Sequence, residues 1–157
     1  MRFTAEGMNV NSPAFSPDGG TVYFLSAKSG SMRLWAQPVA GGEALRISDY
    51  PVDVNSYKIS PDGRQVALSI EVYTDCGTLA CSKQRLDEAG ARKASGMVFD
   101  KTFIRHWDAY SDGRRNQLFA AGFDAAGKLS ATPKLVSRGI DGDVPSVLTG
   151  AGAAVGS

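Results

Sequence analysis

A repeated segment constrains the fold of this chain more than any other feature of its sequence. Residues 11–25 read NSPAFSPDGGTVYFL, and residues 55–69 read NSYKISPDGRQVALS. The two segments begin 44 positions apart and share seven of their fifteen residues, including the whole of Ser-Pro-Asp-Gly. A repeat of about 40–45 residues built from short strands is typical of four-stranded β-propeller blades. The sequence therefore predicts an all-β chain, a partial β-propeller with two four-stranded blades.

The Ser-Pro-Asp-Gly motif predicts a tight hairpin turn in each copy. Pro17 fixes φ at the first turn position, Asp18 can accept a hydrogen bond from the backbone ahead of it, and Gly19 tolerates a positive φ. Apolar, β-branched and aromatic residues follow each turn, so strands are expected over 21–25 and 65–70.

The remaining strands of the two blades are expected over 32–39 and 43–48 in the first copy and over 114–123 and 133–137 in the second. Leu118 and Phe119 then stand where Leu34 and Trp35 stand in the first copy. Their offset is 84 positions rather than 44, so about 40 residues are inserted between the second and third strands of the second blade. We interpret Trp35, Phe119 and Tyr23 as core residues of the blade packing.

This pattern divides the chain into four segments. They are residues 1–10 as the last strand of a preceding blade with a linker, 11–54 as a blade, 55–142 as a blade carrying the insertion 75–105, and 143–157 as a low-complexity tail. A closed propeller needs at least about four blades. The chain is therefore expected to be part of something larger, as a truncated product or gene fragment.

The insertion is expected to be a solvated surface excursion, with a lid or partner-binding element as the alternative. Ser82 could cap a short helix that runs to about Lys93, in which Glu88 and Arg92 are spaced for an ion pair. Leu86 and scattered alanines are the apolar residues that this helix offers.

Cys76 and Cys81 are the two cysteines of the chain, and both fall on the insertion. Their even number and close spacing favour a local disulfide and hence an oxidising compartment. Two free thiols in a cytosolic protein are the alternative. Zinc needs four ligands, and His106 is the one histidine that could join them, so a zinc site is not expected.

The sequence shows no recognisable catalytic, cofactor or metal site. A serine hydrolase needs a sharp turn, usually Gly-x-Ser-x-Gly, with a histidine and an acid, and this chain contains no such segment. His106 beside Asp108 is better read as a packed residue than as a base. Asp141 and Asp143 are better read as a loop turn than as a cation site, and phosphate-binding glycine loops are absent from the sequence.

The charge and hydropathy of the chain argue against nucleic acid and membranes as partners. Lys and Arg total 17 against 16 for Asp and Glu, which gives no basic footprint for nucleic acid or an anionic membrane. No stretch approaches the roughly 18 apolar residues of a membrane span. The first ten residues lack the apolar segment of a signal peptide.

A family resemblance rests on the two Ser-Pro-Asp-Gly hairpins, on the segment SGSMRLWAQPVAGGEALRISDYPVDVNSYKISPDG, and above all on DCGTLAC followed by KASGMVFDKTFIRHWDAYSDGRRNQLFAAGF. Over about residues 1–145, the chain resembles the propeller domain of bacterial prolyl oligopeptidase-family serine peptidases, of the dipeptidyl aminopeptidase/acylaminoacyl-peptidase type. The resemblance implies a non-catalytic propeller that gates peptide access to an α/β-hydrolase domain. It also implies a periplasmic or secreted parent, and no catalytic residue carries over to this chain.

Other functions stay open at this point. The chain could be a non-enzymatic propeller module of the Tol or WD type, whose open blade faces would allow self-association. It could also be an inactive truncated product. In the leading reading, its partners are the missing hydrolase domain and the remaining blades, and peptides are the substrates of the parent enzyme.

Overall fold

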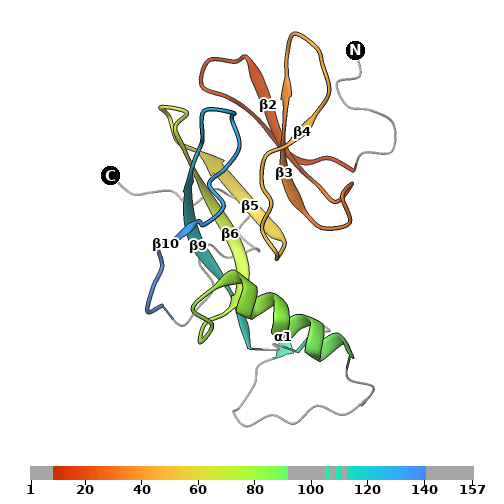
Figure 1. The fold of residues 1–157 in the computed structure, drawn as a ribbon, viewed down its shortest axis with the longest axis vertical. Coiled ribbons are helices and arrows are strands. Elements are labelled where there is room, and N and C mark those ends of the chain that lie inside the picture. The colour runs from red at the N-terminus through yellow and green to blue at the C-terminus, as the bar shows by residue number, and fades with distance from the viewer. Residues whose placement is uncertain (1–8, 92–104, 107–108, 111–112, 141–157) are drawn as a thin grey trace.

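Two four-stranded antiparallel sheets form most of the protein, with one helix at the end of the second sheet (Figure 1). The computed structural model describes residues 9–91, 105–106, 109–110 and 113–140. The expected strand at the N-terminus and the expected low-complexity tail lie outside these residues.

The first sheet has the strand order β1-β2-β3-β4. Its strands are β1 (Asn11–Phe15), β2 (Thr21–Ser26), β3 (Arg33–Pro38) and β4 (Leu45–Arg46). Consecutive strands are neighbours, as in a propeller blade. The fourth strand is shorter than the expected 43–48, because Leu45 and Arg46 are the residues of this segment that pair with β3.

The second sheet repeats this order with an insertion. Its strands lie in the order β10-β9-β6-β5, with the bounds β5 (Val54–Ile59), β6 (Gln65–Tyr73), β9 (Arg114–Gly122) and β10 (Lys134–Leu135). The insertion contributes α1 (Leu79–Ala91) and a short hairpin of β7 (Arg105–His106) and β8 (Ala109–Tyr110). The expected all-β architecture with two four-stranded sheets is confirmed, and the insertion falls between the second and third strands of the second sheet.

The two Ser-Pro-Asp-Gly turns have the same hydrogen-bond network. In the first turn the Asp18 carboxylate accepts hydrogen bonds from the Ser16 hydroxyl and from the Gly20 N–H, while the Ser16 hydroxyl oxygen accepts the Thr21 N–H. In the second turn, the residues 44 positions further on make the same bonds. Gly19 has a φ of 72°, which glycine adopts at little cost.

The third and fourth strands of the two sheets also correspond at the level of single atoms. The Leu34 N–H donates to the Ser48 hydroxyl at 2.8 Å, and the Leu118 N–H donates to the Ser137 hydroxyl at 2.9 Å. Leu34 pairs with Leu25 across the sheet, and Leu118 pairs with Ser69, which is the repeat equivalent of Leu25. The alignment of Leu118 with Leu34 is therefore correct, although 84 residues separate them in sequence.

A hydrophobic core lies between the two sheets and joins them. It contains buried residues from both, among them Leu25, Leu34, Val66, Leu68 and Phe119. On β6, alternate residues from Val66 to Val72 point into this core, as the two-residue period of a strand requires. At about 25 cal/mol per Å² of apolar surface, burial of this kind is the main stabilising contribution.

Polar contacts join the same two sheets at their margins. The Leu129 N–H donates to the Ile47 carbonyl at 2.8 Å, and the Tyr50 hydroxyl donates to the Ser130 carbonyl at 3.0 Å. Burial raises the pKa of Tyr50 to about 12. The hairpin loop after β9 is therefore held against the loop that links the two sheets.

Candidate functional site

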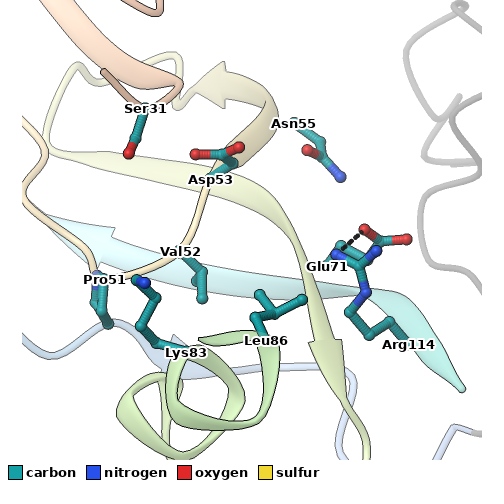
Figure 2. Close-up of a pocket in the computed structure, with 9 residues that line it drawn as sticks. All are labelled: Ser31, Pro51, Val52, Asp53, Asn55, Glu71, Lys83, Leu86 and Arg114. Atoms are coloured by element: carbon teal, nitrogen blue, oxygen red, sulfur yellow. Dashed lines mark ion pairs between the residues drawn. The ribbon is translucent and has the colours of Figure 1, made fainter. Parts of the chain in front are cut away.

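A polar cleft runs between the two sheets at the end where α1 lies, and we call it the interblade cleft. One part is a cavity of about 250 Å³, whose lining includes Ser31, Asp53, Asn55, Glu71, Lys83 and Arg114 (Figure 2). A second hollow of about 650 Å³ shares Asp53, Asn55 and Glu71 with the first and adds Asn116 and residues of β1. The loop before β5, the end of β6, the start of β9 and α1 all contribute to the lining.

Asp53 lines the cleft from the loop that links the two sheets. Its carboxylate accepts a hydrogen bond from the Met32 N–H at 3.0 Å and lies 3.6 Å from the Arg33 guanidinium. The Arg33 side chain is buried and donates to the Val52 carbonyl at 3.0 Å. Burial lowers the pKa of Arg33, and the negative charge of Asp53 opposes that shift. Arg33 therefore fixes the loop that carries Asp53.

The opposite wall is built where β6 and β9 pair. The Glu71 carboxylate and the Arg114 guanidinium form an ion pair at 2.7 Å (Figure 2). Deeper in the sheet, the buried Asn116 accepts a hydrogen bond from the Asn55 side-chain amide at 2.7 Å and one from the Ser69 hydroxyl at 3.4 Å. The cleft floor is therefore an ordered polar network.

The helix α1 forms a third side of the cleft. It presents Lys83 and Leu86 toward the cavity (Figure 2). The expectation that Ser82 caps this helix is wrong, because the Thr78 hydroxyl accepts the Cys81 N–H at 3.2 Å and the helix begins at Leu79. Ser82 lies inside the helix, fully buried, and its hydroxyl accepts the Tyr73 N–H at 3.2 Å. The expected partner of Glu88, Arg92, falls outside the described residues.

The two cysteines lie where β6 leads into α1. Cys76 and Cys81 form a disulfide, with Cα atoms 5.6 Å apart. The bridge closes a ring of six residues that contains the Thr78 cap. It ties the first turn of α1 to the connector that follows β6.

The cleft carries groups for polar recognition. Carboxylates, amides, an ammonium group and a guanidinium group face one space, and Ser31 supplies a hydroxyl. Among the lining residues that the structure describes, Ser31 has no histidine beside it to act as a base. Within the same described ranges, no group of three or more His, Cys, Asp or Glu is placed to hold a metal ion.

The structure describes some of the other candidate residues that the sequence indicated. His106 lies on β7 and pairs with Ala109 in the small hairpin, whereas Asp108, Asp141 and Asp143 lie outside the described residues. Phe119 is buried in the core between the sheets, and Tyr23 packs against that core.

The interpretation of Trp35 as a core residue is wrong for this core. It is half-buried and lies outside the cluster, and its indole N–H donates to the Ser26 carbonyl at 3.2 Å. Trp35 pairs with Phe24. This pair occupies the face of the first sheet opposite Leu25 and Leu34, because successive residues of a strand alternate between faces.

Sequence reasoning did not find the cleft. Its residues come from separate loops, strands and α1, which only the fold brings together. One signal was present: Glu71 interrupts an apolar run in β6, and a carboxylate inside such a run requires a partner. Arg114 provides it from the start of β9.

Comparisons with known proteins give distant, partial similarity to propeller proteins. No family model matches the chain. The chain is 33% identical over 67 residues to the Tol-Pal system protein TolB of Francisella tularensis subsp. tularensis (strain WY96-3418), which covers 42% of this chain and 15% of that protein. It is 34% identical over 61 residues to YuxL of Bacillus subtilis (strain 168), described as an uncharacterized peptidase, which covers 38% of this chain and 9% of that one.

A solved structure from Agrobacterium tumefaciens, assigned to TolB, aligns with 91% of this chain and 40% of its own, at 18% identity and a TM-score of 0.48. The alignments thus span a minor part of the relatives. None of the helices in the described ranges is long and apolar enough to cross a membrane.

Proposed function

We propose that this chain supplies two non-catalytic blades to the propeller of a prolyl oligopeptidase-type serine peptidase, and that this propeller gates peptide access to an α/β-hydrolase domain outside the 157 residues. The observation that carries the proposal is the similarity to the peptidase YuxL over 61 residues. The resemblance of the Cys-containing insertion and of the segment RHWDAYSDGRRNQLF points to the same class. Peptides are then the substrates of the parent enzyme.

Exposed apolar surface supports a structural role beside further blades. Among the described residues that line the polar cleft, no histidine is present to serve Ser31 as a base. Several large apolar side chains stay exposed away from the core, including Phe15 at 66% and Leu45 at 60%. Further blades packed beside these two would cover part of this surface. The disulfide fits a periplasmic or secreted parent, where such bonds persist.

The experiment compares two purified proteins, the 157-residue chain and the product of the uninterrupted coding region that contains it. Both are assayed with aminoacyl and dipeptidyl p-nitroanilides and with an unfolded protein substrate. We expect the 157-residue chain to show no hydrolysis above background. The longer product should cleave the short substrates and leave the protein substrate intact, and Ser→Ala in its Gly-x-Ser-x-Gly segment should abolish cleavage. A longer product without peptidase activity contradicts the proposal.

A second candidate is a binding module like TolB, and the 67-residue similarity to that protein favours it. TolB is described as a component of the Tol-Pal system, so Pal is the partner to test. Binding of immobilised Pal by the longer product, together with no peptide hydrolysis, supports this candidate. Hydrolysis without Pal binding excludes it in favour of the peptidase.

A further inference from the structure

The disulfide lies at the point where α1 meets the second sheet. Cys76 follows the end of β6, and Cys81 is the third residue of α1. Both residues are half-buried, so a small reductant can reach the bridge. The bond therefore joins the first turn of the helix to the connector after β6, where the Cys76 N–H donates to the Tyr73 carbonyl at 3.0 Å.

The other contacts that hold α1 are of two kinds. The buried Ser82 hydroxyl accepts the Tyr73 N–H at 3.2 Å, and Leu79 and Leu86 pack against the core between the sheets. The polar contacts at the surface of the helix are exposed. The Arg85 guanidinium pairs with the Asp75 carboxylate at 2.8 Å, with 44% and 65% of the two side chains exposed. Arg85 also lies over the Tyr73 ring, 5.3 Å from its centroid. Exposed ion pairs of this kind contribute little, and a 13-residue helix is marginal without tertiary contacts. The disulfide therefore adds a covalent restraint at the first turn of α1 to the buried contacts of Ser82, Leu79 and Leu86.

The position of α1 in turn sets one side of the interblade cleft. Lys83 and Leu86 project from the helix into the cavity, opposite Asp53 and the Glu71–Arg114 pair (Figure 2). Leu86 also packs against the core between the sheets. Displacing the helix would remove these two side chains from the cleft and leave its other sides, which belong to the sheets, in place.

We propose that the Cys76–Cys81 disulfide is a thiol-sensitive latch that holds α1 as a side of the interblade cleft. A thiolate of a small dithiol attacks one Sγ, the S–S bond breaks, and a mixed disulfide forms with release of the other cysteine as thiolate. The second thiolate of the reductant then displaces the remaining cysteine and leaves as a cyclic disulfide. Two electrons pass from the dithiol to the bridge, and each cysteine takes up one proton. The latch does not depend on the peptidase proposal.

The expected change in the opening equilibrium of α1 follows from the length of the loop that the disulfide closes. A six-residue loop restricts the open state enough to change the opening constant of α1 by about thirtyfold, on the loop-entropy estimate. Trypsin cleavage measures the opening of α1 directly, because trypsin cleaves after Lys83 and Arg85, both within this helix. When opening is fast relative to cleavage, the cleavage rate follows the population of the open form.

The test is limited proteolysis of the whole chain, either oxidised or reduced with a dithiol and alkylated. We expect reduction to accelerate cleavage after Lys83 about thirtyfold and to leave cleavage after Arg64, in the exposed turn of the second blade, unchanged. The double variant Cys76→Ser/Cys81→Ser should behave like the reduced protein without any reductant. Circular dichroism of each sample establishes that both sheets remain folded.

A matched control separates the disulfide from the ion pair. Arg85→Gln removes the Asp75 contact from the oxidised protein, and we expect it to change cleavage after Lys83 by less than about threefold. If Arg85→Gln accelerates cleavage as much as reduction does, the ion pair holds the helix and the latch is refuted. It is refuted equally by unchanged cleavage after reduction, or by equal acceleration at Lys83 and Arg64, which would indicate global unfolding.

Discussion

Replacing Leu68 with alanine should destabilise both sheets together. Leu68 is fully buried in the core between them, and on its own sheet it pairs with Tyr57 and Phe119. Truncating a leucine at such a site costs about 3–5 kcal/mol, because the lost transfer free energy adds to the cost of a cavity. With a urea m-value of about 1.5 kcal/mol per M, the midpoint should fall by about 2–3 M.

The assay is equilibrium unfolding in urea, followed by two probes in a Trp107→Phe background. Fluorescence then reports Trp35 in the first sheet, because the chain has two tryptophans, and far-UV circular dichroism reports both sheets. We expect both probes to give one transition with the same midpoint, before and after the substitution, since the core joins the sheets.

Leu45→Ala is the matched control. It removes the same atoms from a side chain that is 60% exposed on β4, so its effect should stay within about 0.5 kcal/mol. The reasoning is refuted if Leu68→Ala shifts the circular dichroism transition and leaves the Trp35 transition in place. That result would mean that the two sheets unfold independently.

Three further predictions concern single residues. Ser48→Ala should cost about 1–3 kcal/mol in urea unfolding because it leaves the Leu34 N–H without its hydroxyl acceptor; a change below about 0.3 kcal/mol refutes that role. Hydrogen bonds from the Ser60 hydroxyl and the Arg64 N–H hold the pKa of Asp62 below its ordinary 3.8. The stability that Asp62 adds is therefore present above about pH 4 and lost as the pH falls through its lower folded pKa. Asp62→Asn should flatten the acid limb of a stability–pH curve, and an unchanged limb contradicts this. Gly19→Ala should cost about 1–2 kcal/mol through its φ of 72° alone, since an added Cβ meets nothing within 4 Å; an unchanged melting temperature would oppose it.

Local turn chemistry made much of the fold predictable from the sequence. Ser-Pro-Asp-Gly encodes its own hydrogen bonds within five residues, so the two hairpins follow from the motif. The match of Leu118 to Leu34 also followed, because the pattern of the third strand survives the insertion. These features depend on neighbours in sequence, which a single chain displays.

Features that depend on distant partners were harder to predict. The strand β6 runs to Tyr73 rather than Ile70, because its last residues pair with the start of β9. The fourth strands are short, and their pairing partners decide where they end. The predicted helix start at Ser82 differs from the observed start after Thr78, because both residues can cap a helix. The Ser82 hydroxyl instead accepts the N–H of Tyr73, on the strand before the helix. The cleft arises in the same way, from charges that meet only after folding.

The nucleotide sequence on both sides of this coding region tests the central claim most directly. If these are two blades of a peptidase, the continuous reading frame contains further Ser-Pro-Asp-Gly repeats at about 40–45 residues. A Gly-x-Ser-x-Gly segment should follow downstream, with an aspartate and then a histidine in the order of an α/β-hydrolase. Flanking sequence that encodes neither further blades nor this segment, in any frame, would contradict the account.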